Sequence, residues 1–234
     1  MSAIIAFNPN DIANKISSIL SPISQEHHNL IANTMETRIF ECNELVYEEG
    51  NVPTNIMCLL EGKVKIYKNG VGNKSQILRT VSPIEFFGYG AYLSRENYLT
   101  SAMALERSVI ALIPMQTILQ LIKENNNICL FFFNNLARLL GNSYNRTVNL
   151  TQKHIRGRLA ESLLMLEDCY GFEHDGQTLT VRLSREDLAN MSSMTTSNAI
   201  RTLSAFASEG LITVSGRKIK IINHRELSHI SILG

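Results

Sequence analysis

Residues 183–222 constrain the fold most strongly, because the spacing of their apolar residues changes from helical to strand-like. Ser184 is followed three residues later by Asp187, which is close to a capping box, so we expect a short helix to begin there. Polar residues at 191–195 interrupt this helix. Apolar residues then recur at helical spacing, namely Ala199, Ile200, Leu203 and Phe206. The pattern predicts two helices joined by a tight turn, which is a helix-turn-helix.

The residues after the second helix follow a different period. Gly210 ends the helical spacing, and two β-rich runs follow at 211–214 and 219–222. Ser215 and Gly216 lie between these runs and favour a hairpin turn. The segment therefore predicts a helix-turn-helix with a β-hairpin wing.

The start of the second predicted helix is polar. Hydroxyls, amides and Arg can bond base edges or phosphates in the major groove of DNA, so we interpret the segment as a DNA-binding element. The candidate DNA contacts are Ser184, Thr195, Thr196, Ser197, Asn198, Arg201, Arg217 and Lys218. Two alternatives stay open: the small polar residues can serve only as helix caps, and a winged helix can bind a protein partner.

The charge balance does not by itself indicate a nucleic-acid-binding protein. The formal net charge is +1, and from residue 152 onward ten Lys and Arg residues stand against nine Asp and Glu residues. Attraction to DNA must therefore come from the placement of charges, and Arg185, Arg201, Arg217 and Lys218 could share one face. We expect a modest non-specific affinity and an affinity that depends on dimerisation.

Length and composition indicate two domains and no membrane span. A chain of 234 residues with 44% hydrophobic content can bury two modest cores. No apolar run reaches the roughly 20 residues that cross a bilayer, and the N-terminus lacks a signal-peptide pattern, so we expect a cytoplasmic protein. The cysteines lack metal-ligand spacing and predict reduced, mostly buried thiols and no metal site: Cys42, Cys58, Cys129 and Cys169.

The first part of the chain predicts a helical lead-in. Weak helical periodicity covers residues 2–20, residues 21–24 break it, and Ser24 is suited to cap a second helix that runs to about residue 34. His27 and His28 lie side by side in that helix. Adjacent helical residues do not face a common ligand, so we expect both imidazoles to be exposed on the surface.

Between residues 36 and 114, short β-rich runs alternate with turns marked by Gly, Pro and Asn. This spacing predicts a barrel or sandwich of antiparallel strands. The predicted strands are 38–40, 45–47, 56–60, 64–67, 76–81, 101–104 and 108–113. At Pro114 the period becomes helical again and predicts a short helix that Asn125, Asn126 and Asn127 break.

A long amphipathic helix is predicted over residues 128–150. Its apolar residues recur at three and four residues, and five of them would line the seam if the helix serves dimerisation: Phe132, Leu136, Leu139, Leu140 and Val148. By its pattern alone the helix is either the core of one domain or a dimer seam. A further helix over 151–170 would pack under the helix-turn-helix, with Gly171 closing it.

Several segments together resemble the Crp/Fnr-type bacterial transcription regulators over almost the whole chain. Residues 43–50 and 59–67 resemble the opening of that family's cyclic-nucleotide-binding β-roll, and Phe86-Phe87-Gly88 falls at its phosphate-binding turn. Residues 113–114 fall where the roll hands over to helix, and 154–164 resemble the segment after the family's dimer helix. The order and spacing of these motifs carry the resemblance.

The resemblance implies an α+β architecture with three parts. An antiparallel, jelly-roll-like β-roll with its helical lead-in would form a sensor domain over residues 1–126. A dimerisation helix over 127–151 and a winged helix-turn-helix over 152–234 would follow. The family further implies a homodimer on a near-palindromic operator with half-sites about one helical turn apart, and RNA polymerase as a partner.

The sensor part departs from the family pattern. Cyclic-AMP-binding members carry a Glu for the ribose and an Arg for the phosphate, where this chain has Tyr89 and Thr100. A buried phosphate without its Arg loses a charge-assisted contact, so we do not expect cyclic AMP as the effector. The clustered cysteines of iron-sulfur members and a His between 28 and 154 for haem are also missing. A different small molecule could bind a pocket lined by Tyr89, Tyr92, Thr100 and Ser101, or the pocket could be vestigial.

The recognition helix departs from the family as well. Many members read bases with an Arg-Glu pair, and this chain has Thr196 and Ser197 at those positions, while the family's further Arg matches Arg201. We therefore expect a different half-site, read by Thr196, Ser197 and Asn198, with Arg201 on a guanine or a phosphate.

The sequence bears on two other classes of function. A cyclic-nucleotide- or small-molecule-binding signalling protein, with a C-terminal domain that contacts a protein partner, remains the alternative. A metal-dependent barrel enzyme needs two or three His residues with a carboxylate, and residues 36–114 contain no His. We therefore predict that the protein is not an enzyme and has no cofactor.

Overall fold

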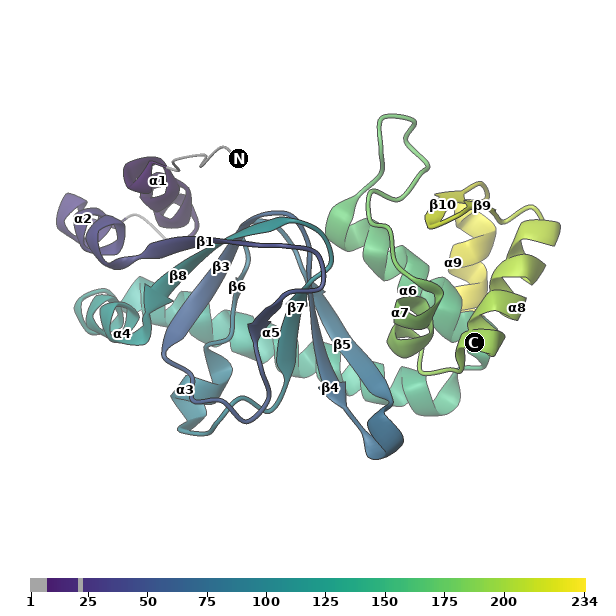
Figure 1. Ribbon diagram of the computed structural model, residues 1–234, viewed down its shortest axis with the longest axis horizontal. Coiled ribbons are helices and arrows are strands. Elements are labelled where there is room, and N and C mark those ends of the chain that lie inside the picture. Colours follow the sequence, from purple (N-terminus) through teal and green to yellow (C-terminus); the bar gives the residue numbers. More distant parts are fainter. Residues whose placement is uncertain (1–7, 21–22) are drawn as a thin grey trace. The chain divides into compact units, whose positions relative to one another are not determined.

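The computed structural model describes residues 8–20 and 23–234 and divides into two compact units (Figure 1). Unit 1 comprises Met1–Lys65 and Val81–Leu140, and unit 2 comprises Ile66–Thr80 and Gly141–Gly234. The beginning of the predicted lead-in, residues 1–7, and Ser21 and Pro22 of the predicted break lie outside the described residues. Across the two described ranges, no helix is long and apolar enough to cross a membrane.

Unit 1 begins with two helices, α1 (Pro9–Leu20) and α2 (Gln25–Thr34). The predicted cap is confirmed, because the Ser24 hydroxyl accepts a hydrogen bond from the His27 backbone N–H at 3.2 Å. The prediction of two exposed imidazoles is wrong. His27 Nε2 lies 2.7 Å from a carboxylate oxygen of Glu124, and His28 is only 8% exposed. The two side chains reach different neighbours because helical neighbours point about 100° apart.

The β-roll consists of two four-stranded sheets, with strand orders β1-β8-β3-β6 and β2-β7-β4-β5. Antiparallel pairing, as predicted, joins β3 to β8 and β6, β1 to β8, and β2 to β7. The strands are β1 (Glu36–Phe40), β2 (Leu45–Tyr47), β3 (Asn55–Glu61), β4 (Val64–Asn69), β5 (Ser75–Val81), β6 (Phe86–Phe87), β7 (Ser101–Ala104) and β8 (Ser108–Pro114). A 3-10 turn, η1 (Val71–Asn73), lies between β4 and β5.

The core of unit 1 lies between the β1-β8-β3-β6 sheet and helices. Alternate residues of β3, Ile56, Cys58 and Leu60, join one apolar cluster with buried residues of α1 such as Ile16. Two helices follow β8, namely α4 (Met115–Glu124) and α5 (Asn126–Gln152), and both contribute buried residues to this cluster. A short helix, α3 (Gly90–Ser94), and the strand β6 were not predicted, because so few residues show no period.

Unit 2 contains α6 (Ile155–Tyr170), α7 (Arg185–Met191), α8 (Thr196–Ser208), the wing strands β9 (Ile212–Ser215) and β10 (Lys218–Ile221), and α9 (His224–Leu233). The β4–β5 hairpin and the end of α5 belong to the same unit, which differs from the predicted boundaries at residues 126 and 151. Side-chain bonds explain the grouping. Gln76 on β5 accepts a hydrogen bond from the Ser193 hydroxyl at 2.6 Å, although the two residues are far apart in sequence.

The final helix, α9, was not predicted and packs against α6. The two elements approach closely at Gly157 of α6. A Cβ atom placed on Gly157 would lie 2.6 Å from the Cα of Gly234, so only glycine fits this backbone contact without a shift.

Candidate DNA-binding surface and sensor residues

The first helix of the predicted helix-turn-helix is fixed by its N-cap. The Ser184 hydroxyl accepts a hydrogen bond from the Asp187 backbone N–H at 3.0 Å, as a capping box requires, and donates to the Asp187 carboxylate at 2.6 Å. Leu188, Ala189 and Met191 face the interior. Ser184, a candidate DNA contact, is thus partly buried and has a clear structural role as a cap.

The turn between α7 and α8 places the second helix. Ser193 has a φ of 51°, in the left-handed region that few non-glycine residues adopt, and this reverses the chain within a few residues. The Ser192 hydroxyl donates to the Ser162 hydroxyl of α6 at 2.8 Å in a buried position. Thr195 then caps α8 by accepting a hydrogen bond from the Asn198 backbone N–H at 3.2 Å.

Helix α8 has one buried and one exposed face. The buried residues are Ala199, Thr202, Leu203 and Phe206. The exposed residues near the N-terminus of the helix are Thr196, Ser197, Ile200, Arg201 and Ser204. Arg201 donates to the side-chain oxygen of Asn198 at 2.7 Å, which holds the guanidinium along the helix. The candidates Thr196, Ser197 and Arg201 therefore share one exposed face, and the partly buried Asn198 orients the Arg.

The wing follows α8 as an antiparallel pair in which Lys218 lies opposite Ser215. Gly216 has a φ of 58°, which the tight turn requires, and Arg217 beside it is exposed. Arg185 donates to the Gly216 carbonyl oxygen, so α7 and the wing turn are bonded to each other. Arg217 thus lies at the tip of the wing, and Arg185 stabilises the wing turn through its hydrogen bond to Gly216.

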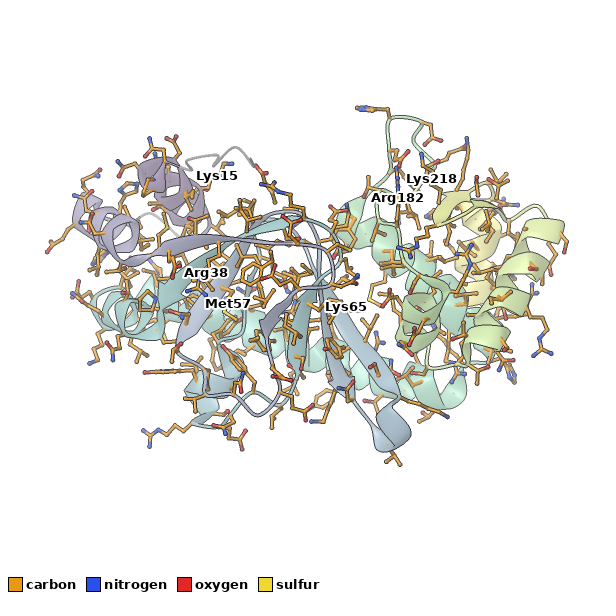
Figure 2. The ribbon with its side chains drawn as sticks, in the orientation of Figure 1. Lys15, Arg38, Met57, Lys65, Arg182 and Lys218 are labelled. Carbon is orange, nitrogen blue, oxygen red and sulfur yellow. The ribbon has the colours of Figure 1, made fainter. Side chains whose placement is uncertain are left out.

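Lys218 forms an ion pair with Glu173. Its ammonium lies 3.4 Å from one carboxylate oxygen of Glu173, and Arg182 lies 3.4 Å from the other. Figure 2 shows Arg182 and Lys218 close together beside the loop that follows α6. Since all three side chains are partly exposed, this network is weak and salt-dependent. A phosphate could displace Glu173 from Lys218, although the carboxylate lowers the local positive charge.

The loop that carries Glu173 is an ordered part of the unit and was not predicted. Asp175 accepts hydrogen bonds from the Thr178 backbone N–H at 2.8 Å and from the Thr178 hydroxyl at 2.7 Å. These bonds hold the pKa of Asp175 below its ordinary value. The loop then pairs with the wing, because the Leu179 N–H donates to the Ile219 carbonyl at 2.9 Å.

The four candidate effector residues in unit 1 fall into two pairs. Tyr89 is 3% exposed, and its ring lies 5.2 Å from that of Phe132 in an edge-to-face arrangement. Tyr92 packs against the same core cluster. Thr100 and Ser101 instead lie beside the β2 segment. The Ser101 hydroxyl accepts the backbone N–H of Glu49 at 3.0 Å.

The sequence patterns did not indicate the aromatic pair of Tyr47 and Tyr98 beside Thr100. Tyr47 and Tyr98 stack with ring centroids 4.0 Å apart, and the Tyr47 hydroxyl lies 3.4 Å from that of Thr100. Burial, followed by the proximity of Tyr47, raises the pKa of Tyr98 above its ordinary value. Tyr47 lies on a strand and Tyr98 in the loop before β7, so the two give no local signal in a sequence, because only the fold brings them together. Among the described residues, no group of three or more His, Cys, Asp and Glu could hold a metal ion.

Two of the five residues predicted for the dimer helix need a correction, because they pack inside their own unit. Phe132 is 3% exposed and packs on Phe86 at 5.6 Å, and Leu136 is partly buried against the same core, so these two residues serve their own unit. Leu139 is partly buried, and Leu140 and Val148 are exposed. A row of large exposed apolar residues runs along α5: Leu130, Phe133, Leu140, Tyr144 and Val148. The sequence pattern did not separate the face that packs on the core of unit 1 from the exposed face. Apolar residues of both faces recur at intervals of three and four residues.

The comparisons with known proteins agree with this architecture. Residues 37–125 match the family described as cyclic nucleotide-binding domain, and residues 157–230 match the Crp-like helix-turn-helix domain. The chain is 23% identical over 190 residues to a CRP-like cAMP-activated global transcriptional regulator of Mycobacterium tuberculosis, covering 81% of this chain and 85% of the relative. It is 27% identical over 178 residues to the cAMP-activated global transcriptional regulator CRP of Pasteurella multocida, covering 75% and 85%.

A solved structure with the same fold is that of FixK2 from Bradyrhizobium japonicum. It superposes with a TM-score of 0.76 at 19% sequence identity and covers 84% of this chain and 97% of that one. At this identity the likeness concerns the fold. The predicted order of β-roll, long helix and winged helix-turn-helix is thereby confirmed.

Proposed function

The chain belongs to the Crp/Fnr-type transcription regulators, and we propose that it acts as a homodimer that binds a near-palindromic DNA operator. The observation that carries this proposal is the exposed face of α8, where Thr196, Ser197 and Arg201 lie together at the N-terminal end of the second helix of a winged helix-turn-helix. This part of a recognition helix enters the major groove in such folds.

The proposed dimer forms through α5. The side chains of Leu130, Phe133, Leu140, Tyr144 and Val148 are between 48% and 67% exposed, which leaves a long apolar row open to water on one helix. These residues are three, seven, four and four positions apart, which keeps them on one helix face and suits a seam between two parallel helices. A second copy of the chain would cover this row and would present a second α8 to the DNA. Half-sites about one helical turn apart follow from this two-fold geometry.

For the sensor unit we propose an effector other than cyclic AMP, or none. Both sequence relatives are named as cAMP-activated. In this chain the position expected to hold the phosphate is the uncharged Thr100, whose hydroxyl faces Tyr47 at 3.4 Å. The Ser101 hydroxyl already accepts the Glu49 N–H. A bound phosphate would thus lack a charge-assisted partner at this position. A saturable heat of binding on titration of cyclic AMP into the protein would contradict the proposal that cyclic AMP is not the effector.

The proposed DNA-bound dimer would regulate transcription through contact with RNA polymerase. The first test is selection of the ligand-free protein against randomised duplex DNA, followed by sequencing of the enriched sites. We expect a two-fold palindrome whose half-sites differ from those of members with the Arg-Glu pair. An enriched site without two-fold symmetry would contradict the homodimer. Absence of any enrichment, also with candidate effectors added, would favour a winged helix that binds a protein partner.

A further inference from the structure

Ile200 is the one large apolar side chain on the otherwise polar exposed face of α8. It is 47% exposed, whereas its helical neighbours Ala199 and Leu203 are 0% and 3% exposed. The side chains that surround it on the exposed face are Thr196, Ser197, Arg201 and Ser204. About half of the surface of Ile200 is therefore open to a partner.

A single exposed apolar residue needs no explanation on most of a protein surface. Ile200 differs in its position, since it precedes Arg201 directly and lies one turn after Thr196 and Ser197. These are the side chains that the proposed function directs toward base edges. Any DNA that Arg201 reaches would also come close to Ile200.

The chemistry of the major groove limits what an aliphatic side chain can recognise there. Ile has no hydrogen-bonding group, so it gains nothing from the donors and acceptors of the base edges. It would instead leave such groups without water or a partner. The apolar feature on the major-groove edges is the C5-methyl group of thymine. A thymine is therefore the base that suits Ile200.

We propose that Ile200 is a specificity-determining residue that selects a thymine by packing against its methyl group, in the same half-site that Arg201 contacts. The inference rests on the proposed function and adds a base preference to it. Adjacent helical residues point about 100° apart, so Ile200 and Arg201 would reach different points of the same groove. The β-branched side chain is nearly locked in a helix, and the bond of Arg201 to Asn198 restricts the Arg.

The test removes the methyl group alone. After the operator has been selected, each thymidine of a half-site is replaced in turn by deoxyuridine, and binding is measured for the parent and for Ile200→Ala. We expect one replacement to weaken the parent roughly fourfold, the effect of one buried methyl-sized group. The same replacement should leave the affinity of Ile200→Ala unchanged, because the contact is already lost.

The matched control is Ile232→Ala, since Ile232 is an exposed isoleucine of α9 in the same unit. This variant should respond to deoxyuridine as the parent does. The inference is overturned if the parent binds its operator but tolerates every replacement, or if the effects of Ile200→Ala and of deoxyuridine simply multiply. Failure to select any sequence would overturn the proposed function as well, so the two failures are distinguishable.

Discussion

Arg146 of α5 donates from Nη2 to the carbonyl oxygen of Met191, the last residue of α7, at 2.8 Å. The same nitrogen donates to the carbonyl oxygen of Ile77 on β5 at 2.6 Å. One side chain thus joins the β4–β5 hairpin to the first helix of the helix-turn-helix within unit 2. Burial lowers the pKa of Arg146, and the charge of Glu161 opposes this shift.

Replacement of Arg146 by Met should lower the free energy of unfolding by about 2 to 3 kcal/mol, because two buried carbonyl groups lose a charged donor. Urea denaturation at one fixed protein concentration measures the change, since a dimer's stability depends on concentration. Arg138→Met is the control on the same helix, where the side chain is exposed and donates to the side-chain oxygen of Asn135. An equal loss in both variants would contradict the role of Arg146.

The end of α8 gives a pH-dependent prediction. Glu209 caps the C-terminus, where the helix dipole disfavours an anion, and it is bonded by both terminal nitrogens of Arg156 at 2.8 and 2.6 Å. The hydrogen bonds from Arg156 lower the pKa of Glu209 below its ordinary value, and the pair raises the pKa of Arg156. A depressed carboxyl pKa stabilises the fold above the pKa of the unfolded state.

Glu209→Gln should therefore be less stable than the parent at pH 7, by under about 1 kcal/mol because the pair is more than one third exposed. The difference should shrink as the pH falls below the ordinary glutamate pKa of 4.5 and through the lowered value. Thermal unfolding followed from pH 7 to pH 3 tests this. A difference that stays constant with pH would exclude the ion pair as its cause.

Cysteine reactivity should separate the buried from the exposed thiols. Desolvation, and then the nearby charge of Glu85, raises the pKa of Cys58 to about 12. Cys42 and Cys129 are exposed. In the native protein at pH 8, we expect iodoacetamide to modify Cys42 and Cys129 while Cys58 remains unmodified. Peptide mass spectrometry before and after denaturation measures this, and rapid modification of native Cys58 would contradict its burial.

The sequence alone predicted those parts of the fold in which each element carries its own local signal. The caps at Ser24 and Ser184 and the closing Gly171 place helix ends because each acts on its nearest neighbours in the chain. The strands from β1 to β8 were found within a few residues, apart from the two-residue β6. Thr196, Ser197 and Arg201 were also placed on one helix face, as their spacing requires, whereas Asn198 is partly buried.

Long-range contacts could not be predicted in this way. The pair of His27 with Glu124 and the stack of Tyr47 on Tyr98 join residues whose separation in sequence carries no periodic signal. For α5 the pattern was present but ambiguous, since Phe132 and Tyr144 fit the same spacing although one is buried and the other is 64% exposed. The face of α5 that packs against the β-roll is buried, and the opposite face remains exposed to solvent.

The exposed row on α5 predicts a dimer that a single charge disrupts. Tyr144→Glu should dissociate the dimer at micromolar concentration, because a carboxylate at an apolar seam loses its hydration on association. Folding of each chain should be preserved, since Tyr144 is 64% exposed. Analytical ultracentrifugation measures the mass, and circular dichroism checks the fold.

Asn145→Glu is the matched control for Tyr144→Glu. Asn145 is exposed as well, and it points about 100° away around the helix. We expect this variant to remain dimeric. Dissociation of both variants would mean that charge alone drives the effect, and dissociation of neither would place the dimer interface elsewhere.

Arg201 gives the most direct test of the recognition helix. Its side chain is exposed on α8 and is held by Asn198 at 2.7 Å, so it can reach a base edge without first leaving a buried site. If Arg201 reads a guanine, Arg201→Ala should cost roughly 1 to 3 kcal/mol of specific binding and relax the preference at one position. If it contacts a phosphate, all sequences should weaken alike and the salt dependence should fall. Titration against the selected operator and its single-base variants at two salt concentrations separates these outcomes.

Arg225→Ala, which removes an exposed Arg of α9, is the control and should bind like the parent. Equal binding of the operator by Arg201→Ala and the parent would remove Arg201 from the DNA-contacting surface.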